Sequence, residues 1–246
     1  MSARLGFVAL LLGVVSVIWI AQRGADELHR FRSTDPRVWE ADIARFEREA
    51  AEAPASAGVI TIIGASTIRF WETAAEDLAP FEVMRRGFGG AKLADVSYYA
   101  DRLATPKPRA LILSIGGNDL FEFAGSGSAD PEEAGAACVA LLEKFRTLLP
   151  GVPIYYIAIR PPILDAQGRD PSSKVNRLML EFSEATSGVE FIDANVGMYD
   201  DDGQLRDGFR AWDGSQLSSK GYAAWSAPIR DRLIRDLGAS ESSALR

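Results

Sequence analysis

The chain has 246 residues, of which 47% are hydrophobic and 25% charged, a composition typical of one globular domain with an additional segment. Its formal net charge of −7, without a cluster of Lys and Arg, argues against a nucleic-acid partner, because phosphate binding needs gathered cations. A single cysteine, Cys138, and a single histidine, His29, exclude an intramolecular disulfide and cannot supply a zinc site, and we predict neither a metal nor a cofactor.

The first segment contains an uncharged apolar run at residues 5–21, between Arg4 and Arg23. Such a run spans about 25 Å as a helix, which is at the short end for crossing a bilayer. It ends in Trp19, Ile20 and Ala21 rather than at a small-residue cleavage site, which favours an uncleaved anchor over a cleaved signal peptide. Residues 1–24 are therefore predicted to be a single-pass membrane anchor or signal segment, with the domain on the periplasmic or extracellular side.

Residues 25–57 are predicted to form a linker and an amphipathic helix. Asp35 and Pro36 suit the start of this helix, since Asp caps free N–H groups and Pro fits the first turn. Trp39, Ile43 and Phe46 then recur at helical spacing. We expect this apolar face to pack on the domain that follows.

Residues 58–238 alternate short β-rich runs with longer amphipathic runs, which predicts an α/β three-layer sandwich with a central parallel sheet of about five strands. The expected strands contain VITII, FEVM, ALILSI, PIYYIAI and VEFID, and the clearest helices cover residues 131–149 and 218–237. Cys138 falls on an apolar helical run and is expected to pack as a small hydrophobe. Residues 239–246 are predicted to be a disordered tail.

The loops after the first three strands are rich in glycine and small residues: GAST at 64–67, GFGG at 87–90 and GGND at 116–119. Parallel sheets bind ligands outside the carboxyl ends of their strands, so chemistry is expected in these loops. Ser66 lies where a strand feeds a helix, a turn that exposes its hydroxyl and whose N–H groups can stabilise an oxyanion.

The sequence resembles the SGNH (GDSL-type) ester hydrolases over about residues 58–235. IIGASTIRFW is similar to the nucleophile block of that family, RRGFGGAKLADV to its glycine block, LSIGGNDL to its asparagine block and WDGSQLSSKGYAAW to its final Asp-x-x-His block. Each motif alone is weak, but the four in order are specific. The resemblance implies a flavodoxin-like fold and hydrolysis of small acyl esters or acylated glycans.

Carried over by position, the resemblance makes Ser66 the nucleophile and Asp213 the residue that orients the base. The implied oxyanion hole comprises the N–H groups of Ser66 and Gly90 and the side-chain amide of Asn118. The family histidine is replaced by Gln216.

A glutamine amide cannot accept and return a proton near neutral pH, and losing the base of a serine triad costs on the order of 10⁴ to 10⁶ in rate. Weak or lost activity is expected. The alternative is a catalytically inactive, membrane-anchored binding or scaffold protein that retains the oxyanion pocket.

Other side chains near these motifs admit both a functional and a structural reading. Arg69, Trp71 and Arg160 are candidate substrate-binding residues for an anionic or sugar-like ligand, with surface or packing roles as the alternative. The GFGG run lacks the third glycine of a dinucleotide fingerprint. DDDG at 200–203 lacks calcium-loop spacing and is expected to be a polar turn.

Overall fold

The structure is a computed structural model that describes residues 24–52, 58–122, 125–161, 171–212, 214 and 216–238. The predicted apolar span at 5–21, the tail at 239–246 and Asp213 lie outside the described residues. Among the helices of the described part, none is both long and apolar enough to cross a membrane.

A central sheet of five parallel strands organises the domain, in the order β2-β1-β3-β4-β5. The strands are β1 (Ile60–Gly64), β2 (Val83–Gly87), β3 (Ala110–Ser114), β4 (Ile154–Ile157) and β5 (Val189–Ile192). The chain runs from β1 to β2 on one side, and then crosses back to form β3 on the other side of β1. That reversal places the carboxyl ends of β1 and β3 side by side, with β4 next to β3.

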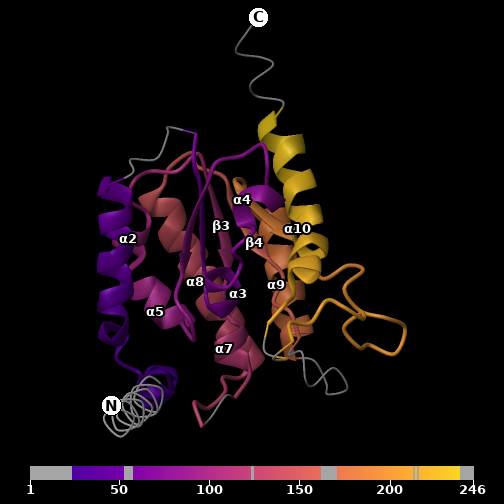
Figure 1. Ribbon diagram of the computed structural model, residues 1–246. Coiled ribbons are helices and arrows are strands. Elements are labelled where there is room, and N and C mark those ends of the chain that lie inside the picture. Colours follow the sequence, from indigo (N-terminus) through magenta and orange to yellow (C-terminus); the bar gives the residue numbers. More distant parts are fainter. Residues whose placement is uncertain are drawn as a thin grey trace, which may run out of the picture.

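Helices cover both faces of the sheet (Figure 1). One face carries the 3-10 helix η1 (Pro36–Trp39) with α2 (Glu40–Glu52), α5 (Leu93–Tyr98), α6 (Ala100–Leu103), α8 (Pro131–Leu148) and α9 (Pro171–Ala185). The other carries α3 (Ser66–Arg69), α4 (Ala74–Asp77) and α10 (Ser219–Leu233), which continues into the π-helical turn η2 (Ile234–Gly238). The short α7 (Gly117–Leu120) follows β3, and residues 24–32 are also helical.

Successive strand residues point to opposite faces, which explains the two cores. Ile60 and Ile62 of β1 belong to the core under α10, whereas Ile63 belongs to the core under α8. All three side chains are fully buried. The expected α/β sandwich with a five-stranded parallel sheet is confirmed.

The helix starts expected from the sequence are present. The Asp35 side chain accepts a hydrogen bond from the N–H of Arg37, and Asp130 accepts one from Glu132. Each such cap contributes about 1 kcal/mol to helix stability. Trp39, at the end of η1, is buried against the domain with Ile43 and Phe46 of α2, as its periodicity predicted.

The second strand differs from the expectation. FEVM at 81–84 was the expected run, but β2 begins at Val83 and continues through two arginines to Gly87. The arginines are tolerated because carbonyl groups satisfy their guanidinium groups. Arg85 donates to the carbonyls of Ile68 and Arg69, whereas the buried Arg86 donates to carbonyls at the end of α6.

Cys138 is buried within α8, as expected for a packing residue. Its thiol lies 3.3 Å from the hydroxyl of Tyr156. Burial raises the pKa of the Cys138 thiol to about 12, so it stays protonated and unreactive at neutral pH.

Candidate active site

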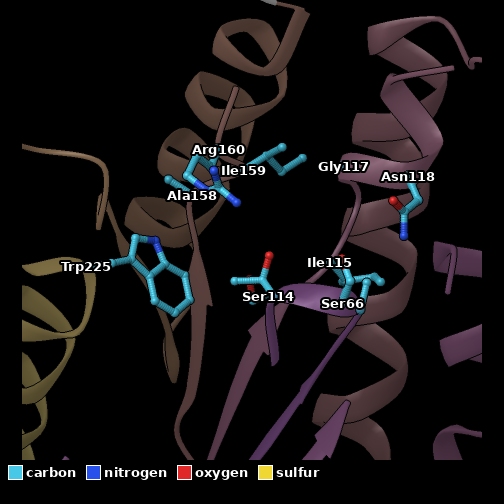
Figure 2. A pocket seen from close by; sticks show the side chains of 11 residues that line it. Ser66, Ser114, Ile115, Gly117, Asn118, Ala158, Ile159, Arg160 and Trp225 are labelled. Atoms are coloured by element: carbon cyan, nitrogen blue, oxygen red, sulfur yellow. The ribbon is translucent and has the colours of Figure 1, made fainter. Parts of the chain in front are cut away.

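A cavity of about 80 Å³ lies at the carboxyl ends of β1, β3 and β4 (Figure 2). Its walls come from the loops that follow these strands and from α10. The lining residues are Ala65, Ser66, Thr67, Ser114, Ile115, Gly117, Asn118, Ala158, Ile159, Arg160 and Trp225. Two predicted site residues, Ser66 and Asn118, therefore line one cavity although they are far apart in the sequence.

Ser66 is the first residue of α3, directly after β1 and the cap residue Ala65. The first N–H groups of a helix have no acceptor within the helix, so they are available to a negatively charged ligand. The turn is held from two directions. The Tyr222 hydroxyl donates to the carbonyl of Thr67 at 2.9 Å, and a Cβ at Gly87 would lie only 2.2 Å from the N atom of Arg69. Glycine at position 87 thus allows β2 to approach α3 closely.

Asn118, in the short helix α7 after β3, connects this helix to the glycine loop after β2. Its Nδ2 donates to the carbonyl of Ala91 at 2.9 Å, one residue after Gly90. A primary amide carries two hydrogens, so the second hydrogen of Nδ2 is available to an oxyanion. Gly90 adopts a φ of 83°, in the left-handed region that favours glycine. It is not among the residues that line the cavity.

Asp119 strengthens this connection, a role that the motif comparison did not assign. Its two carboxylate oxygens accept hydrogen bonds from the N–H of Leu93 at 3.2 and 3.1 Å. The pKa of Asp119 is raised to about 7, mainly by burial and in part by the nearby Asp95, against the opposing hydrogen bond from Leu93 and charge of Lys92. The short helix α7, which carries Asn118, therefore contains a carboxyl group that titrates near neutrality.

Gln216 lies in the hairpin that precedes α10. Its carbonyl accepts from the N–H of Ala211 at 2.9 Å, and the neighbouring Leu217 pairs with Arg210 in an antiparallel bridge. The side-chain Oε1 is buried and has no hydrogen-bond partner. Gln216 is not among the residues lining the cavity.

The three candidate substrate-binding residues have different surroundings. Trp71 is fully buried in the core beneath α10, stacks on Tyr222 and donates to Asp77 at 2.6 Å. This placement does not support a ligand contact, because packing takes up the whole indole. Arg69 pairs with Glu27 at 3.1 Å outside the cavity. Arg160 lines the cavity.

Trp225 and Ser114 line the cavity but were not expected there. The periodicity of the last helix indicates that Trp225 faces inward, and it is buried. Only the position of α10 relative to the loops decides that part of this inward face meets the cavity. DDDG at 200–203 forms the expected turn, in which the Asp200 carboxylate accepts from the N–H groups of Asp202 and Gln204.

A model of the GDSL-like Lipase/Acylhydrolase family matches residues 60–224. The chain belongs to this family. The match covers β1 through most of the first half of α10, and hence every loop that lines the cavity.

Solved structures with the GDSL-type fold are similar to the chain. One from Streptococcus pneumonia, provisionally described as a platelet activating factor, has a TM-score of 0.69 at 20% identity and covers 88% of this chain and 99% of its own. A GDSL-like lipase from Bacteroides thetaiotaomicron has a TM-score of 0.58 at 15% identity, covering 79% and 100%. A catalytic mutant of the acetylxylan esterase Axe2 from Geobacillus stearothermophilus has 0.55 at 15%, covering 75% and 95%. At these identities the likeness concerns the fold. No curated protein matches significantly.

Proposed function

We propose that the protein is an ester hydrolase of low activity that acts on small acyl esters or acylated glycans. The observation that carries the proposal is that Ser66 and Asn118 line one cavity at the carboxyl edge of the sheet. Membership of the GDSL-like acylhydrolase family supports the reaction class, and the small volume favours a short acyl group. The acetylxylan esterase among the similar structures is consistent with an acetylated glycan as substrate.

In the proposed reaction, the Ser66 oxygen forms a bond to the acyl carbon, the bond from that carbon to the alcohol oxygen breaks, and the serine proton leaves with the alcohol. Water then hydrolyses the acyl-serine, which releases the acid and restores the hydroxyl. The negative charge that develops on the carbonyl oxygen would be stabilised by the N–H groups of Ser66 and Gly90 and by Nδ2 of Asn118. Fixed donors of this kind contribute strongly because they need no reorganisation during the reaction. The bond from Asn118 to Ala91 supports such rigidity.

Low activity follows from Gln216 at the position of the family base. An amide cannot take the proton from the Ser66 hydroxyl, so we assign the residual rate to the oxyanion hole and substrate binding. Asp213 would orient a histidine at position 216, but has no base to orient here. The same substitution favours a second candidate function, a membrane-anchored binding or scaffold protein that keeps the pocket and has lost hydrolysis.

We also propose that residues 5–21 anchor the chain in a membrane, with the domain on the periplasmic or extracellular side. The proposal depends on the uncharged apolar run between Arg4 and Arg23. The helix at 24–32 follows this run directly and packs on the domain, where Glu27 pairs with Arg69. Such packing would hold the candidate site close to the membrane surface.

The test of hydrolysis uses the purified full-length chain in detergent with p-nitrophenyl acetate. We expect turnover that is slow but faster than the uncatalysed reaction. Ser66→Ala should abolish this turnover. Ser187→Ala, an exposed serine before β5, is the matched control and should leave the rate unchanged. Equal rates for the parent and Ser66→Ala would contradict the hydrolase proposal and favour the binding protein.

A further inference from the structure

Two arginines have guanidinium groups enclosed by the domain, and their surroundings differ. Arg86 donates to the carbonyls of Arg102, Leu103 and Thr105, and the Met84 sulfur accepts from its Nε, so every nitrogen of its guanidinium has a partner. Arg160 lies in the cavity wall, and its buried Nε and Nη1 have no hydrogen-bond partner. Arg86 therefore serves the fold. In Arg160 the phenol of Tyr199 takes a side-chain hydrogen bond, but Nε and Nη1 remain without an acceptor.

The same cavity wall contains a further unpaired donor. Trp225 is buried, and its Nε1 also lacks a hydrogen-bond partner. Figure 2 shows Trp225 and Arg160 on one side of the hollow and Asn118 on the other. Buried N–H groups without acceptors destabilise the folded chain, and more so when they are charged, so several in one cavity point to a ligand that supplies acceptors.

The charge around Arg160 is not balanced within the described residues. None of the residues that line the cavity is acidic, and no described carboxylate forms an ion pair with Arg160. The groups that face its guanidinium are the phenols of Tyr199 and Tyr222. Burial lowers the pKa of Arg160 and raises that of Tyr222, so the arginine loses some of its preference for charge while the phenol stays neutral. Arginine nevertheless stays protonated in proteins.

The backbone next to Arg160 is held firmly. The Asn176 side chain accepts from the N–H of Ile159 at 2.8 Å and donates to its carbonyl at 2.9 Å. The Asn195 amide donates to that same carbonyl at 3.2 Å. Three hydrogen bonds, two with Asn176 of α9 and one with Asn195 of a loop, thus fix the residue before Arg160. Such preorganisation reduces the entropy that a ligand-binding side chain loses on binding.

We propose that Arg160 and Trp225 form a subsite for an anionic oxygen group, a carboxylate or a phosphate, carried by the substrate within a few atoms of its ester carbonyl. The inference rests on the proposed ester hydrolysis for the identity of the substrate, but not for the binding of the anion. A guanidinium presents its N–H groups in a fork that matches two oxygens of such a group. The short reach follows from the cavity, which is about 80 Å³ and also contains Ser66.

Binding is tested on the full-length chain in detergent by calorimetric titration with methylphosphonate and with succinate at constant ionic strength. We expect saturable binding of at least one probe, and the better of the two identifies phosphate or carboxylate as the preferred group. Arg160→Met should weaken it at least about tenfold, since a charge-assisted hydrogen bond is lost. Trp225→Phe should weaken it about threefold or more. Arg230→Met, an arginine on the surface of α10, is the matched control and should bind like the parent.

Thermal unfolding separates this subsite from a structural role. Replacing an unpaired buried charge by an apolar chain of similar size is often neutral or stabilising, so Arg160→Met should unfold at the same or a higher temperature. Arg160→Lys retains the charge without the fork, and should bind with intermediate affinity. The proposal would be overturned if the parent showed no saturable binding or if Arg160→Met bound the probes as tightly as the parent. It would also be overturned if Arg160→Met lost much stability while Arg160→Lys kept the affinity of the parent.

The substrate arm compares a neutral p-nitrophenyl ester with the p-nitrophenyl monoester of succinic acid. We expect kcat/KM to favour the anionic ester in the parent and the preference to disappear in Arg160→Met. Ser66→Ala should abolish both rates while leaving methylphosphonate and succinate binding unchanged. Arg160-dependent binding without any hydrolysis would contradict the proposed function but retain the subsite. Hydrolysis without a preference for the anionic ester, and without anion binding, would support the proposed function but contradict the subsite.

Discussion

The ring of Phe31 lies so close to Gly90 that a Cβ at position 90 would be 2.6 Å from Phe31 Cε1. Phe31 belongs to the helix at 24–32, whereas Gly90 belongs to the glycine loop and is a proposed oxyanion donor. The N-terminal helix therefore packs directly on the loop that Asn118 joins through Ala91. The segment next to the proposed anchor thus helps to hold the candidate site.

Gly90→Ala should destabilise the domain by about 1–3 kcal/mol, because alanine resists a positive φ and its Cβ would meet the Phe31 ring. Phe31→Ala in the same chain should recover part of this loss, the steric part, but not the backbone part. Urea unfolding of the two single variants and the double variant measures the coupling. Strict additivity would show that Phe31 does not contact Gly90 in solution.

Gln216→His should raise ester hydrolysis by at least about tenfold, because it would supply the base that the remaining site lacks. The measurement is kcat/KM on p-nitrophenyl acetate. Gln204→His, at an exposed position in the turn before Leu205, is the matched control and should have no effect. If Gln216→His folds and is no more active than a parent whose activity depends on Ser66, the base lies elsewhere and the final motif is misaligned.

Ser66 should react slowly or not at all with a fluorophosphonate probe. Without an adjacent base its hydroxyl stays protonated and is a weak nucleophile. Gel fluorescence after timed labelling of the parent, Ser66→Ala and Gln216→His gives the rates, and the last variant should label fastest. Rapid stoichiometric labelling of the parent at Ser66 would show that another group activates the serine.

Asp119 should make stability depend on pH between about 4 and 7. Its pKa rises from 3.8 to about 7 on folding, so the folded chain binds more protons in this range, and its stability falls as pH rises. Asp119→Asn removes this titration while keeping an acceptor for the N–H of Leu93. Its stability relative to the parent should therefore improve from pH 4 to pH 7, by up to about 4 kcal/mol. The control Asp201→Asn, at an exposed turn residue, should show no such trend in urea unfolding.

The full-length chain should fractionate with membranes and resist extraction by alkaline carbonate, because the run at 5–21 is apolar and uncharged. Removing residues 1–23 should release it to the soluble fraction. The helix at 24–32 packs on the glycine loop, so the chain without residues 1–23 should have a higher unfolding midpoint than the chain without residues 1–33. Recovery of the intact full-length chain in the soluble fraction would refute the anchor.

The sequence by itself determined the alternation of strands and helices and the capped starts at Asp35 and Asp130, because periodicity and capping are local properties. It also placed Ser66 and Asn118 in loops after the first and third strands, at the carboxyl edge of the sheet, because ligands of parallel sheets bind at that edge. It could not predict that Trp71 and Trp225 have different surroundings: Trp71 fills the core, whereas Trp225 lines the cavity. Nor could it predict that β2 continues through Arg85 and Arg86.

Those distinctions depend on contacts between segments distant in the chain. Arg86 finds carbonyls at the end of α6, whereas Nε and Nη1 of Arg160 find no acceptor, and no local pattern distinguishes the two arginines. The pKa of Asp119 depends in the same way on its burial and on its hydrogen bonds from Leu93, the first residue of α5. Burial and hydrogen-bond satisfaction are properties of the packed whole, because each depends on which distant groups displace water from a side chain. Only the tertiary structure decides them.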